Sequence, residues 1–289
     1  MNDQTQPTPS THGTSRRTVL KGAGASIALG TAGWNARNMV GGITPAAAQT
    51  TPHSAPGRLA VVFLRGGMDG LSAVVPANES AYYDARPTIA IPDNQVLDLD
   101  GQFGMHPSLS RLHGLFNQGR VAVAVGTGNL AGNRSHFVAQ DLWEYGTTTG
   151  NADGMGWLGR HLSGTGSTTD SLFRALTMGN LVDLSLRGAP ALNVLSIEKF
   201  GLVPAAATLR SSMANTYQGD RPIEVTGRTA LDAIDLVRGL NGSSAPGGPA
   251  RSFGDAIELL DGGLGVEVVT LNLGGWDTHA DMGLSLIHI

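Results

Sequence analysis

The sequence predicts an α/β fold in which a mostly parallel central sheet is flanked by helices. Strongly apolar runs of strand length recur along the chain, and each of them ends in glycines: residues 59–64, 120–125 and 266–273. Continuous apolar runs of this kind are typical of strands buried on both faces of a parallel sheet. Apolar residues at helical spacing lie between or beside them, at about 108–117, 138–144, 229–240 and 251–260. Strands that alternate with helices indicate an α/β sheet.

Shorter elements fill the remainder of this pattern. Residues 88–92 predict a short strand ended by Pro92, residues 154–162 predict a short helix, and residues 174–178 are a further strand candidate. Residues 179–228 contain short apolar pieces broken by glycine and proline, and they predict an irregular region of the kind that a cap-like insertion would form.

The net charge and the lack of cysteine argue against some classes of function for this chain. The chain has 289 residues, 41 glycines, no cysteine and a net charge of -4. A nucleic-acid-binding protein needs a basic surface, which this charge balance does not favour. The absence of cysteine excludes disulfides and thiolate metal sites, so any metal must be held by oxygen and imidazole ligands.

The first 48 residues resemble a twin-arginine (Tat) export signal. Ser15-Arg-Arg-Thr-Val-Leu-Lys21 precedes a glycine- and alanine-rich run, and Ala46-Ala-Ala48 provides small residues for cleavage. We expect Arg16 and Arg17 to be recognised by the Tat translocase and cleavage to occur near Ala48. The apolar run is too short for a bilayer span, which needs about 20 residues. The mature protein is therefore expected in the periplasm or medium, without a stable membrane span. Residues 49–57 read as a linker to a domain at 58–283.

Candidate chemistry follows the first strand. Asp69 lies in a turn with Gly66, Gly67 and Gly70, directly after residues 59–64. Ligands of open α/β sheets bind just beyond the carboxyl ends of the strands, and glycine permits close approach. Asp69 is therefore a candidate ligand-binding acid. The alternative is an ordinary strand-to-loop turn that contains an acid.

Ser135 falls at the predicted start of the helix at 138–144. A serine at this position normally caps a backbone N–H group. The same place favours anions, so a hydroxyl there, beside Arg134 and His136, could attack a phosphate or sulfate ester. The preceding glycines, Gly126, Gly128 and Gly132, miss the dinucleotide-binding spacing, which argues against an NAD-type oxidoreductase.

Asp277 and His279 follow the last predicted strand and are two residues apart. On an extended segment their side chains point the same way, so both can reach one ion. An Asp oxygen and a His nitrogen suit Zn²⁺ or a similar divalent metal. The alternative is a surface turn with a capping Asp. The sequence thus predicts that Asp69, Ser135 and Asp277 meet at one rim of the sheet, with a divalent metal as the cofactor.

Three segments resemble the motifs of the DUF1501 family of exported bacterial proteins: Leu64-Arg-Gly-Gly-Met-Asp-Gly-Leu71, Arg134-Ser-His-Phe137 with Ala139-Gln-Asp141, and Gly275-Trp-Asp-Thr-His279. That family is grouped with the alkaline phosphatase and sulfatase superfamily. The resemblance implies an alkaline-phosphatase-like fold that hydrolyses a small anionic ester between metal ions. It implies that Asp69, Asp277 and His279 are metal ligands and that Ser135 is the nucleophile.

The chain departs from this family after about residue 281. Family members continue with a Glu-Phe-Gly-Arg segment and a Thr-Asp-His-Gly segment that complete the metal site, and neither occurs here. Residues 284–289 resemble translated sequencing-adapter sequence. We therefore expect a domain incomplete at its C-terminus and inactive by itself. The leading hypothesis is a metal-dependent phosphate- or sulfate-ester hydrolase. The alternative is a non-catalytic exported protein that keeps the fold and binds a ligand or surface partner.

Overall fold

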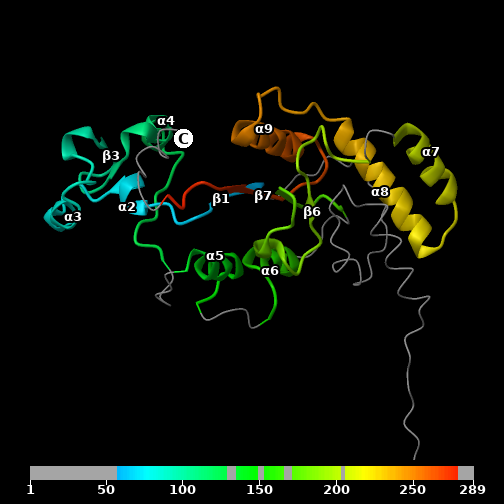
Figure 1. The fold of residues 1–289 in the computed structure, drawn as a ribbon, viewed down its shortest axis with the longest axis horizontal. Coiled ribbons are helices and arrows are strands. Elements are labelled where there is room, and N and C mark those ends of the chain that lie inside the picture. The colour runs from blue at the N-terminus through cyan, green and yellow to red at the C-terminus, as the bar shows by residue number, and fades with distance from the viewer. Residues whose placement is uncertain (1–56, 129–134, 149–152, 166–170, 203–205, 279–289) are drawn as a thin grey trace, which may run out of the picture. The chain divides into compact units, whose positions relative to one another are not determined.

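The computed structural model describes residues 57–128, 135–148, 153–165, 171–202 and 206–278. The central element is a four-stranded, mostly parallel sheet of order β1-β7-β5-β6 (Figure 1). Its strands are β1 (Leu59–Leu64), β5 (Ala175–Met178), β6 (Leu192–Asn193) and β7 (Val268–Leu273). Helices flank this sheet, which confirms the predicted α/β class. Among the described helices, none is long and apolar enough to cross a bilayer.

The chain divides into two compact units. The first unit holds the chain up to Ala60, Leu162–Val182 and Leu186–Val269, and the second holds Val61–His161, Asp183–Ser185 and the chain from Thr270 onward. Strands β1 and β7 each begin in the first unit and end in the second.

The first unit contains the longest helices. They are α7 (Ala206–Thr216), α8 (Pro222–Arg238) and α9 (Gly248–Asp261), and α7 lies beside α8 (Figure 1). Helix α8 begins seven residues earlier than the predicted position 229, because Pro222 occupies its first turn and the Glu224 side chain accepts a hydrogen bond from the Arg221 backbone N–H. The apolar face of α8, which includes Ile234 and Val237, is buried.

The prediction of an irregular region at 179–228 is wrong in part. Strand β6 pairs in parallel with β5, with Leu176 opposite Leu192 and Thr177 opposite Asn193. Helix α7 and the start of α8 also fall in this region. Two-residue pairings and helices interrupted by glycine leave little periodicity in the sequence, so the pattern alone did not reveal them.

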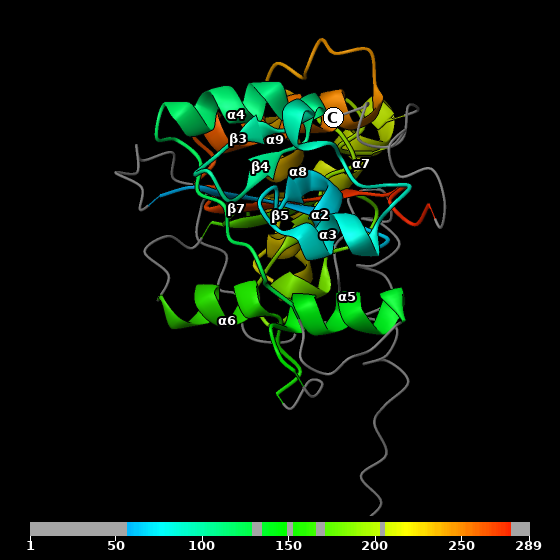
Figure 2. The ribbon, with the colours of Figure 1, turned by 90° about the vertical axis from the view of Figure 1, so that its left-hand side faces the viewer.

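The second unit contains a small antiparallel sheet and several short helices. The sheet has the order β2-β4-β3, and Met105 lies opposite both Val74 and Leu97 (Figure 2). Its elements are α2 (Gly70–Ala73), β2 (Val74–Val75), α3 (Ser80–Ala85), β3 (Leu97–Asp98), β4 (Gly104–Met105), α4 (Ser110–Asn117), α5 (His136–Tyr145) and most of α6 (Trp157–Gly164), with 3-10 turns at Asp93–Gln95, Pro107–Leu109 and Leu184–Leu186.

Helix α5 positions much of the predicted site. It begins after Ser135, whose Oγ accepts a hydrogen bond from the Val138 N–H at 3.5 Å, and it ends at Gly146 in the left-handed conformation (φ +62°). The predicted helix at 138–144 and its cap are therefore confirmed. Figures 1 and 2 both place α5 to one side of β1 and β7.

Two predicted strands are wrong, and a third is buried less than predicted. Residues 120–125 form no regular secondary structure, and Val125 is 46% exposed. Residues 88–92 form a turn and an extended piece with Ile89 exposed. Strand β1 forms as predicted but is not buried on both faces, because it is the edge strand of the sheet and exposes Val62.

Candidate functional site

The turns after β1 and β7 lie side by side in the second unit. The Arg65 N–H donates to the Leu273 carbonyl at 2.8 Å, and the Trp276 N–H donates to the Arg65 carbonyl at 3.3 Å. The chain therefore leaves the two strands at the same rim of the sheet, so the residues that follow each strand are brought together.

Two glycines allow a very close approach at this rim. Gly66 (φ +112°) lies so near the second turn that a Cβ added to it would meet the Asp277 backbone nitrogen at 2.4 Å. Gly67 (φ +80°) lies against His136, whose Nδ1 would be 2.8 Å from an added Cβ. Only glycine adopts these conformations readily and leaves this space. The glycine turn thus contacts both the N-terminus of α5 and the segment after β7.

The His136 imidazole and the Asp277 carboxylate lie next to each other at this place. The His136 Nε2 lies 3.3 Å from the Asp277 Oδ1, and the two side chains are 41% and 48% exposed. Ser135 precedes His136 and caps α5, so its hydroxyl lies at the positive end of the helix dipole. A carboxylate that orients an imidazole beside a helix N-terminus is suited to proton transfer and to binding an anion. Arg134 and His279, also predicted site residues, lie outside the described residues.

Asp69 has different partners. Its two carboxylate oxygens accept hydrogen bonds from Arg86 at 2.6 and 2.9 Å, from the Ser72 hydroxyl at 2.7 Å and from the Leu71 N–H at 3.1 Å. Burial by itself would raise the pKa of Asp69, but the hydrogen bonds from Arg86 and Ser72, the charge of Arg86 and the Leu71 N–H together lower this pKa below its ordinary value. Asp69 is therefore a charged helix cap paired with an arginine.

The predicted metal site is described only in part, because His279 lies outside the described residues and Asp69 is engaged by Arg86. In the described part of the chain, no three residues among His, Cys, Asp and Glu are grouped closely enough to hold a metal ion. A divalent cation at Asp69 would also have to replace or approach the Arg86 guanidinium, which is electrostatically unfavourable. His136 and Asp277 are two suitable donors, but two donors alone do not make a closed zinc site.

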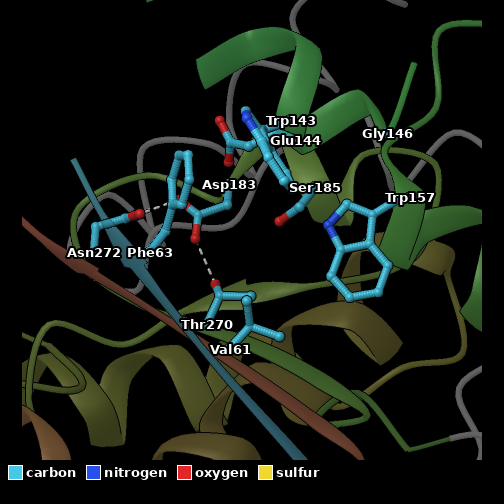
Figure 3. Close-up of a pocket in the computed structure, with 10 residues that line it drawn as sticks. All are labelled: Val61, Phe63, Trp143, Glu144, Gly146, Trp157, Asp183, Ser185, Thr270 and Asn272. Carbon is cyan, nitrogen blue, oxygen red and sulfur yellow. Dashed lines mark hydrogen bonds between the residues drawn. The ribbon is translucent and has the colours of Figure 1, made fainter. Parts of the chain in front are cut away.

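A charged network beside this rim was not predicted from the sequence. The Arg65 guanidinium donates to the Asn272 Oδ1 at 2.8 Å and to the Glu144 carboxylate at 3.0 Å, and it lies 3.7 Å from Asp183. Asp183 accepts hydrogen bonds from Thr270 and Asn272 at 2.5 and 2.6 Å (Figure 3). Glu144 and Asp183 are nearly buried, so Arg65 balances charge that would otherwise be costly there.

The only sequence signal for this network is the charge of Arg65 directly after an apolar strand. Its partners come from α5, from the turn at 183 and from β7, which are distant in sequence. Comparison of the chain with the profiles of known families, with curated proteins and with solved structures finds no match.

Proposed function

We propose that this chain belongs to an exported hydrolase of phosphate or sulfate esters in which Ser135 is the nucleophile. The observation that carries this proposal is the juxtaposition of the glycine turn after β1, the N-terminus of α5 and Asp277 after β7. The resemblance of the same three segments to DUF1501 proteins supports an alkaline-phosphatase-like arrangement. The predicted Tat signal supports export.

In this proposal each residue has a separate role. The Ser135 hydroxyl attacks the phosphorus or sulfur atom, and its proton passes to the His136 imidazole, which Asp277 orients. The imidazolium formed on His136 gives this proton to the leaving alkoxide as the ester bond breaks. A water molecule that His136 deprotonates then cleaves the phosphoryl- or sulfuryl-serine, which releases phosphate or sulfate and restores Ser135. The N-terminus of the ten-residue helix α5 stabilises the negative charge of the bound ester and of the transition state.

The proposed metal dependence needs residues beyond those described. Asp277 and His279 would supply two ligands. The resemblance implies that the Glu-Phe-Gly-Arg and Thr-Asp-His-Gly segments of DUF1501 proteins supply others. When bound, such a metal would act as a Lewis acid on the ester. This chain contains neither segment, so we expect it to bind metal and hydrolyse esters poorly by itself.

The test compares this chain with a DUF1501 protein that carries all of the motifs. Bound zinc is measured by mass spectrometry, and hydrolysis is measured with p-nitrophenyl phosphate and p-nitrophenyl sulfate. We expect metal and hydrolysis only in the longer protein, and loss of hydrolysis when the serine of its Arg-Ser-His motif becomes alanine. Equal activity in both proteins would contradict the need for these two segments. Absence of metal and hydrolysis from both would contradict the hydrolase.

The alternative function is a non-catalytic exported protein that retains the fold and binds a ligand or partner. It is favoured by one observation, namely that Arg86 occupies both oxygens of Asp69, the acid after the first strand. A longer protein that binds no zinc, and whose stability is unchanged by chelators, would support this alternative.

A further inference from the structure

A cavity of about 570 Å³ lies within the second unit and shares part of its wall with the charged network, namely Glu144, Asp183, Thr270 and Asn272 (Figure 3). Two indoles, Trp143 from α5 and Trp157 from α6, stand on one side of it. Val61 and Phe63 of β1 provide apolar wall on the strand side, and Ser185 faces the space between. Pockets that hold small ligands have volumes of roughly 300–1,000 Å³ and are mostly apolar.

The walls of this cavity are held by close backbone packing. Gly146, which ends α5, has so little space that an added Cβ would lie 2.9 Å from the Trp157 Cβ. Gly156 lies against the turn at 184–185, where an added Cβ would meet the Leu184 carbonyl oxygen at 2.0 Å. Arg160 adds hydrogen bonds to the Tyr145 and Met155 carbonyls. The two indoles and Ser185 are thus positioned by the fold before any ligand binds.

The polar groups at the cavity are almost all engaged elsewhere. Glu144 is paired with Arg65, and Asp183 accepts hydrogen bonds from Thr270 and Asn272. Ser185 is only 5% exposed, and its side chain faces the cavity. A hydroxyl in a mostly apolar wall gains free energy when a ligand forms a hydrogen bond with it.

We propose that this cavity binds a small, uncharged, planar aromatic molecule that carries one hydrogen-bonding group. Indole rings favour offset or edge-to-face contact with another aromatic ring, and Val61 and Phe63 add apolar wall. The single polar group of the ligand would face Ser185. A charged ligand is disfavoured, because the mostly apolar wall would remove water from the charge, and Arg65 is already paired with Glu144 and Asp183. This inference does not depend on the proposed hydrolase.

The test uses N-phenyl-1-naphthylamine, a neutral aromatic probe with one N–H group whose fluorescence rises in apolar surroundings. The mature chain is titrated with the probe, and energy transfer from tryptophan is recorded. We expect saturable binding of one probe per chain. Trp143→Ala and Trp157→Ala should each weaken binding about tenfold, since each removes an aromatic contact and its buried area. Ser185→Ala should weaken it about threefold or more, because the hydrogen bond is lost.

Two further variants show whether the probe binds inside the cavity. Val61→Phe should block binding by filling the cavity, without removing an indole. Phe137→Ala is the matched control: it removes an exposed aromatic ring from α5 that does not line the cavity, and binding should not change. Circular dichroism shows whether each variant is folded. The proposal is overturned if the probe does not bind. It is equally overturned if folded Val61→Phe and Trp143→Ala variants bind the probe as tightly as the unaltered chain.

Discussion

Asp69 and Asp277 occupy similar places in the sequence but different environments in the structure. Each follows a strand and a glycine turn, at the ends of β1 and β7 respectively. Asp69 is held by an arginine, a hydroxyl and a backbone N–H, whereas Asp277 is half exposed and pairs with His136. The same strand–glycine–acid pattern thus places a carboxylate in two different environments. The partner that the tertiary structure supplies decides whether the acid is held in a hydrogen-bonded cap or stays accessible to solvent.

The largest loss of stability is expected at Gly66, the residue of the Asp69 turn that packs against the Asp277 backbone. Gly66→Ala should destabilise the protein by about 3 kcal/mol, because it adds strain at φ +112° and drives a Cβ into the Asp277 backbone. Gly70→Ala is the matched control, since an added Cβ there meets nothing within 4 Å. Urea unfolding measures both. Similar free energies of unfolding for the two variants would show that the turns are not packed as described.

The next largest loss of stability is expected when Arg86, which pairs with Asp69, is removed. Arg86→Ala should lower the free energy of unfolding by about 2 kcal/mol, because it leaves a partly buried carboxylate without its two charged hydrogen bonds. Arg111→Ala, on the exposed face of α4, should change it by less than about 0.5 kcal/mol. Urea unfolding at neutral pH measures this difference. If both arginine variants behave alike, Asp69 is not a structural acid.

The lowered pKa of Asp69 makes this contribution depend on pH. A carboxyl whose pKa is lower in the folded protein stabilises the fold above its unfolded pKa, near 3.8, and loses that contribution as the pH falls through the folded pKa. Asp69→Asn should therefore be less stable than the unaltered chain at pH 6, and the difference should shrink below about pH 3.8. Unfolding curves from pH 6 to 3 test this. A difference that stays constant with pH would be contrary to the charged pairing.

The smallest effect on stability is expected at the other acid. Asp277→Asn should cost less than about 1 kcal/mol, because its ion pair with His136 is well exposed and screened by solvent. The measurement is the same urea unfolding, made beside Arg86→Ala. A loss at Asp277 as large as the loss at Arg86 would remove the contrast between a structural and an accessible acid.

Local features of the sequence were sufficient for several elements. The apolar runs at 59–64 and 174–178 predicted β1 and β5, and Ser135 predicted the start of α5. These features act over a few residues: side-chain burial in a strand, and a hydroxyl that caps the nearest free N–H groups. They can be recognised without knowledge of the remainder of the chain.

An apolar run does not, however, decide whether a strand finds a neighbour. Residues 121–125 are all apolar, like β1, yet they pair with no strand among the described residues. Strand β1 itself lies at an edge and is partly exposed. Pairing requires a second segment at hydrogen-bonding distance, and its position depends on the path of the whole chain.

The sequence by itself determined the α/β class, the order of most elements and the glycine turns in which Asp69 and Asp277 lie. Only the tertiary structure decided that Asp69 pairs with Arg86, that Asp277 meets His136, and that Arg65 joins Glu144 to Asp183. The physical reason is the separation in sequence of the residues that interact. Caps and apolar periodicity arise from neighbours along the chain, whereas ion pairs and cavities depend on segments that approach one another only after folding.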